Sequence, residues 1–241
     1  MSVTSRNAPC PCRSGQKFKR CCAALADTAA RTAQAHAAVG KRIQAWAAEA
    51  HRDALEAAWA QITGARDDAA LGEVDVQLIS SWIYNDYELP GGGTAAERYS
   101  RLDGLAAGER DIAARIAGAT LGLMRVVQVA PGIWIELEDQ IRQDVVRVIS
   151  RGVSAHTSPG DLIIARRMDG PPAPSLWGPV GFARADTAPG LNALITARLD
   201  SLGLEEGPDA LGEAIRDASL EITILLSPTL RQAARERRRA A

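Results

Sequence analysis

The chain has 241 residues, of which 46% are hydrophobic and 24% are charged. These values are typical of globular proteins and exclude a disordered or collagen-like chain. Because no apolar run approaches the roughly 18 residues of a membrane span, and no secretory signal is expected from the first ten residues, we expect a soluble, cytoplasmic protein.

The net charge of -1 is unevenly distributed, because both ends of the chain are basic. Residues 1–22 carry five basic residues and no acidic one, and residues 231–241 carry five basic residues and one acidic one. The intervening residues 23–230 have a net charge of -10. Either end is therefore suited to an anionic partner, although the alternative for the C-terminal tail is a solvated helix end.

All four cysteines lie within thirteen residues, at Cys10, Cys12, Cys21 and Cys22. A secreted domain stabilised by disulfides would distribute its cysteines along the chain. Four thiols this close in a reducing compartment predict a tetrahedral metal site, and zinc prefers such ligands. Iron in the same site is one alternative, and free thiols or a redox pair are another, although the chain contains no Cys-x-x-Cys.

The residues between the cysteines suit this interpretation. Pro9 and Pro11 restrict the first ligand pair, and Ser14-Gly15 is a turn signal. Such a short segment has almost no core of its own, so binding of a structural zinc ion, which contributes roughly 10–16 kcal/mol, is expected to fold it. Four basic residues offset the negative charge of a zinc ion with four thiolates: Arg13, Lys17, Lys19 and Arg20.

The segment from Asn7 to Cys22 resembles the SEC-C motif, a small zinc-binding module. The family pattern is Cys-x-Cys, eight residues, then Cys followed by Cys or His, with a Ser-Gly turn and an aromatic residue between. Cys10, Cys12, Cys21 and Cys22 fall on the ligand positions, and Phe18 falls on the aromatic one. Arg13 departs from the family, which commonly has Gly there, but the change removes no ligand.

The resemblance implies docking rather than chemistry. The related module of the SecA translocase ATPase contacts the SecB chaperone and the ribosome, and a site with four thiolate ligands has no open position for a substrate. We therefore expect an adaptor that docks on a chaperone, translocase or ribosome-associated protein. The expected contact residues are Arg13, Lys17, Phe18, Lys19 and Arg20, whose alternative role is charge compensation and packing over the metal.

The rest of the chain predicts an α+β fold: a mainly helical body with a small antiparallel β-barrel of four to five strands. An alanine-rich helix over 27–64 either breaks near residues 51–53 or is covered on both faces. Later helices are predicted from a stripe of Leu71, Val74, Leu78 and Trp82, from a capping box of Thr94 and Glu97, and over 109–122.

The sequence pattern changes after residue 122. Short segments rich in β-branched residues predict strands at 123–129, 133–139, 144–150, 161–167 and 177–185, in an OB- or SH3-like barrel. Stripes over 191–202 and 211–225 predict two final helices before the basic tail. We therefore divide the chain into a zinc module at 1–26, a helical region at 27–122, a barrel at 123–186 and C-terminal helices at 187–241. The body also resembles other bacterial SEC-C proteins, which implies no activity.

A search of the body for catalytic patterns finds none, so we do not expect an enzyme. Glu136 and Glu138 are expected on a solvated strand face, and Asp86 and Glu88 either line a pocket or cap a helix. The alternative function is nucleic-acid binding through the basic ends and an OB-like barrel. The barrel segment has seven arginines against seven acidic residues, which does not predict a basic groove, so the adaptor is favoured.

Overall fold

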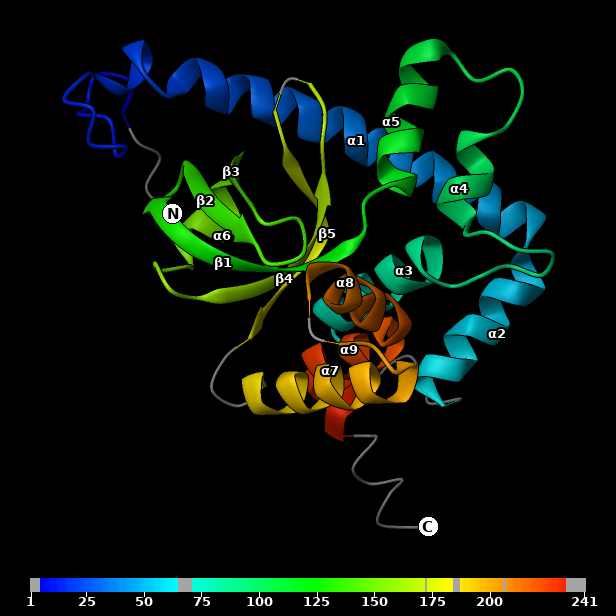
Figure 1. Ribbon diagram of the computed structural model, residues 1–241. Helices are drawn as coiled ribbons and strands as arrows, with labels where there is room; N and C mark the ends of the chain where they lie inside the picture. The colour runs from blue at the N-terminus through cyan, green and yellow to red at the C-terminus, as the bar shows by residue number, and fades with distance from the viewer. Residues whose placement is uncertain (1–4, 65–70, 172, 184–186, 206, 233–241) are drawn as a thin grey trace.

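The computed structural model describes residues 5–64, 71–171, 173–183, 187–205 and 207–232, and it confirms a mixed α+β fold. One five-stranded antiparallel sheet lies between the long helix α1 on one side and α7, α8 and α9 on the other (Figure 1). The helices are η1 (Phe18–Arg20), α1 (Ala23–Ala50), α2 (Arg52–Thr63), α3 (Glu73–Asn85), α4 (Ala95–Ser100), α5 (Ala107–Ala117), α6 (Arg151–Ala155), α7 (Ala188–Leu202), α8 (Pro208–Asp217) and α9 (Ser219–Leu226). The strands are β1 (Leu121–Ala130), β2 (Trp134–Asp139), β3 (Asp144–Ile149), β4 (Leu162–Met168) and β5 (Ser175–Ala183).

The alanine-rich segment forms two helices rather than one. His51 leaves the helical conformation at φ -138°, and this single residue separates α1 from α2. Val39 and Ile43 of α1 pack with α4 and α5, whereas Leu55 and Ile62 of α2 pack in a different cluster. The break predicted near residues 51–53 is confirmed, and it lets the two apolar faces meet different neighbours.

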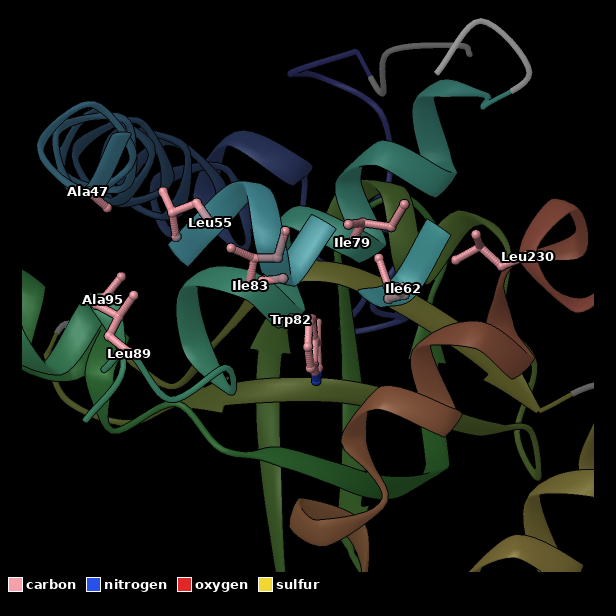
Figure 2. Packing of buried hydrophobic residues seen from close by; sticks show 10 residues of the cluster. Ala47, Leu55, Ile62, Ile79, Trp82, Ile83, Leu89, Ala95 and Leu230 are labelled. Atoms are coloured by element: carbon pink, nitrogen blue, oxygen red, sulfur yellow. The ribbon is translucent and has the colours of Figure 1, made fainter. Parts of the chain in front are cut away.

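The cluster around α3 joins segments that are far apart in the sequence. In Figure 2, Trp82 of α3 lies among residues of α2 and α3, and Leu230 approaches from beyond α9. The Trp82 Nε1–H donates to the Ser219 Oγ at 3.3 Å. The predicted stripe is wrong at Val74, which is 60% exposed, because the face of α3 turned to the core carries a different set. The buried apolar residues of α3 are Leu78, Ile79, Trp82 and Ile83.

The capping box at the start of α4 is confirmed. The Glu97 backbone N–H donates to the Thr94 Oγ1 at 3.3 Å, and the Thr94 N–H donates to Glu97 Oε2 at 3.1 Å. These two bonds satisfy amides that have no partner inside the helix. Figure 1 places α4 and α5 beside the C-terminal half of α1.

The sheet follows the predicted strands closely, in the order β3-β2-β1-β4-β5. Alternation places Ile135 and Leu137 of β2 in a buried cluster with residues of β1, β3 and β4. Their neighbours Glu136 and Glu138 are less buried and pair with Arg147 and Arg125. The two carboxylates therefore lie on a partly exposed, charge-paired strand face.

The predicted closure into a barrel is wrong, because the sheet is open. β3 and β5 are its two edges and are not hydrogen-bonded to each other, although they approach one another. Within β5, Pro179 has no backbone N–H to donate and Gly178 adopts φ +70°, and the β4–β5 register shifts beside them, between Ile164 and Arg166. The N-terminal half of α1 runs over the opening (Figure 1).

The C-terminal helices cover the other side of the sheet. Ile164 of β4 packs with Leu191, Ile195 and Leu199 of α7 and with residues of α8 and α9. The single helix predicted over 211–225 is wrong, because Ala218 separates α8 from α9. Most of the basic tail, 233–241, lies outside the described residues.

Within the described ranges, none of the helices combines the length and the apolar character that crossing a membrane requires.

Candidate metal centre

The cysteines are brought together by a tight N-terminal loop. Pro9 and Lys17 form an isolated antiparallel bridge, and the Cys10 N–H donates to the Gln16 carbonyl at 2.8 Å. The chain reverses through Arg13 and Gly15, which both have positive φ values, of 61° and 76°. The short helix η1 then leads directly into the second cysteine pair. This reversal returns the chain to the first pair, as the Ser-Gly signal and the prolines predict.

The four Sγ atoms form one compact group. Cys12 Sγ lies 3.2 Å from Cys10 Sγ and 3.3 Å from Cys21 Sγ, and Cys21 Sγ lies 3.7 Å from Cys22 Sγ. All four lie within 4.8 Å of one another. A tetrahedral zinc ion with bonds of about 2.3 Å needs sulfur atoms about 3.8 Å apart, so the residues fit such an ion.

The thiols differ in their surroundings. Cys10 and Cys22 are buried, whereas Cys12 and Cys21 are partly exposed. Hydrogen bonding by Ser14 lowers the pKa of Cys12 to about 6, and burial raises the pKa of Cys22. A cation at the centre would favour the thiolate form of all four, because a metal-bound thiol is deprotonated. Sequence reasoning treated Ser14 only as a turn residue, but its Oγ lies 3.2 Å from Cys21 Sγ.

The cysteine loop packs against the sheet through an apolar cluster. Phe18, 7% exposed, lies in this cluster with Ala130, Ile133 and Trp134 from the β1–β2 hairpin. Its side chain therefore packs within the protein, one of the two roles left open by the sequence, and it does not offer an exposed contact. No local sequence pattern predicts that the loop packs against this hairpin.

The cations predicted to contact a partner lie on the surface. Arg13, Lys17, Lys19 and Arg20 are all exposed. Among the described residues, none of the four forms an ion pair with an acidic side chain. Their charge is therefore directed to solvent around the cysteine group.

The three histidines and the acidic residues Asp86 and Glu88 lie apart from this centre. His36 belongs to α1, whereas His51 and His156 are the residues that directly follow α1 and α6. Asp86 and Glu88 do line a cavity of about 640 Å³, with Arg166 of β4. Arg166 donates to both carboxylate oxygens of Asp86, an ion pair that the sequence analysis did not find because its partners are 80 residues apart.

Comparison with known proteins supports the interpretation of the N-terminal segment. The family model for the SEC-C motif matches residues 6–24, which include all four cysteines. Neither a curated protein nor a solved structure matches the chain. The motif and the compact cysteine group together indicate a metal-binding segment at the N-terminus.

Proposed function

We propose that the four cysteines hold one structural Zn²⁺ and that the zinc module, residues 1–26, docks the protein onto a partner as a cytoplasmic adaptor. The observation that carries this proposal is the group of four Sγ atoms within 4.8 Å of one another. Four thiolates complete a tetrahedral zinc site, which leaves no position for water or substrate. The module is therefore suited to shaping a surface, and we propose no catalytic role for it.

The charge of the module supports a partner with an acidic surface. Its four exposed cations, Arg13, Lys17, Lys19 and Arg20, are not neutralised by ion pairs to described acidic residues. Unpaired surface charges of one sign steer association with a complementary partner and make binding sensitive to salt. A chaperone, translocase or ribosome-associated protein is the class of partner that the SEC-C resemblance implies.

The nucleic-acid alternative is less well supported by the sheet. The arginines on its partly exposed strand face, Arg125 and Arg147, are paired with Glu138 and Glu136. Arg147 also lies over the Trp134 ring, 4.2 Å from its centroid. A nucleic-acid groove needs free cations beside exposed aromatic rings, but these two arginines are ion-paired and the Trp134 ring is buried.

The experiment compares three forms of the protein in binding to purified ribosomes and to the SecB chaperone. A triple variant, Lys17→Ala, Lys19→Ala and Arg20→Ala, keeps all four cysteines and is expected to keep its zinc but lose binding. A control, Arg101→Ala with Arg110→Ala, changes exposed cations on another part of the surface and is expected to bind normally. Equal binding by the triple variant and the control would contradict docking through the module. Salt-dependent binding of the wild type to protein-free RNA would favour the nucleic-acid alternative.

A further inference from the structure

A cavity of about 470 Å³ lies under the N-terminal half of α1. Residues from Leu25 to His36 of α1 form one wall, and the end of β3 with the start of β5 forms the other. The cavity therefore occupies the region where the two sheet edges fail to join and α1 covers them (Figure 1). None of the four cysteines lines it, so this is a different place from the metal centre.

The cavity is elongated along the helix. From Leu25 to His36 the axis of α1 rises about 16 Å, at about 1.5 Å per residue. Ile149 packs against the cluster that contains Ala26, which places the β3 end of the cavity beside the zinc module. At the other end, Trp177 packs on Gly40 of α1. Between these ends the helix wall consists of alanines and threonines, so the space suits an extended apolar chain.

The lining carries one ionised group, Arg151; its other polar groups are the hydroxyls of Thr28, Thr32, Ser150 and Ser175 and the His36 imidazole. None of the described residues that line the cavity is acidic, although residues 23–230 carry a net charge of -10. Arg151 lines the β3 end, is exposed and has no acidic partner among the residues that the structure describes. A cation without a counter-charge at one end of an apolar space fits a ligand with a single anionic end.

His36 lines the end of the cavity away from Arg151. The side chain is 3% exposed, and its Nε2 has no hydrogen-bond partner in the described part of the chain. Burial and the charge of Arg115 both lower the pKa of His36, so the ring is neutral and adds no second charge.

We propose that this cavity binds a medium-chain carboxylate, with its aliphatic chain along the alanine face of α1 and its carboxylate at Arg151. The apolar walls provide the affinity, because removing methylene groups from water is favourable. Arg151 provides the preference for an anion over a neutral or cationic head. The site does not depend on the partner proposed for the zinc module.

The test titrates the full-length, metal-loaded protein with decanoate and with 1-decanol, below the concentrations at which either aggregates. Binding is followed by calorimetry and by tryptophan fluorescence, since Trp177 lines the cavity. Arg151→Gln is expected to weaken decanoate binding about fivefold at low salt and to leave 1-decanol unchanged, because the arginine is exposed. Arg101→Gln, an exposed arginine outside the cavity, is the matched control and is expected to change neither.

A second pair of variants fills the space instead of removing the charge. Ala29→Trp and Ala33→Trp are expected to abolish binding of both ligands, while circular dichroism and metal content stay as in the wild type. The proposal is overturned if the wild type shows no saturable binding of decanoate. It is also overturned if Arg151→Gln and Arg101→Gln bind decanoate equally, or if the folded tryptophan variants bind normally.

Discussion

The indole ring of Trp177 in β5 packs directly on the backbone of Gly40 in α1. A methyl group at Gly40 would lie 2.5 Å from the indole Cη2 atom, closer than any real contact allows. This contact explains why a glycine interrupts an alanine-rich helix.

Gly40→Ala is therefore expected to destabilise the protein by about 1–3 kcal/mol, because the overpacking outweighs the better helix propensity of alanine. Gly108→Ala is the matched control, since a methyl group in that helix, α5, meets no atom within 4 Å. The control is expected to be neutral or stabilising by up to about 1 kcal/mol. Urea unfolding of both variants measures the difference, and equal stabilities would show that Trp177 moves aside freely.

Arg13 adopts a left-handed conformation that suits glycine better. Its φ of 61° explains why the motif commonly has Gly at this position. We expect Arg13→Gly to keep full metal content and to raise the free energy of unfolding of the metal-bound module by about 1 kcal/mol. Gly15→Ala, at φ 76°, should have the opposite sign. Thermal unfolding with bound metal checks both, and a loss of metal from Arg13→Gly would contradict this account of the turn.

Asp86 and Arg166 form a buried ion pair between α3 and β4. The Arg166 side chain is 4% exposed and also donates to Ser81 and to the Ala119 carbonyl. Asp86→Ala leaves this guanidinium without its counter-charge and is expected to cost about 3 kcal/mol of stability. Glu136→Ala breaks the exposed pair with Arg147 and should cost at most about 1 kcal/mol. Chemical denaturation measures the free energy of unfolding of both variants. Similar losses of stability would argue against burial of the Asp86–Arg166 pair.

Glu109 connects α5 to α4 and α1 and should make stability depend on pH. The Tyr99 hydroxyl donates to Glu109 at 2.6 Å and Arg42 pairs with it at 2.7 Å; both interactions lower the pKa of Glu109. A lowered pKa in the folded state gives stability that is present above the unfolded pKa and is lost as pH falls through the folded one. The stability difference between the wild type and Tyr99→Phe is thus expected to be larger at pH 7 than at pH 3. A difference that does not change between these pH values would contradict it.

Local signals predicted much of this fold, and long-range contacts account for what they missed. Residue spacing predicted the grouping of the four cysteines, the Thr94–Glu97 capping box and the positions of the five strands. Each of these features depends on residues a few positions apart in the sequence. Closure of the sheet does not follow from spacing, since it depends on whether the two distant edge strands, β3 and β5, pair with each other. The burial of Phe18 similarly depends on the β1–β2 hairpin, more than a hundred residues along the chain.

The most direct test of the proposed zinc centre is the metal content of the purified protein beside a Cys21→Ser, Cys22→Ser variant. Elemental analysis should find one zinc ion per chain in the wild type and none in the variant, because two of its four ligands are gone. One iron ion per chain in place of zinc would support a metal centre at these cysteines but would contradict its assignment as zinc. A wild-type protein purified without chelators that contains no stoichiometric metal would contradict the proposal that these four cysteines form a metal centre.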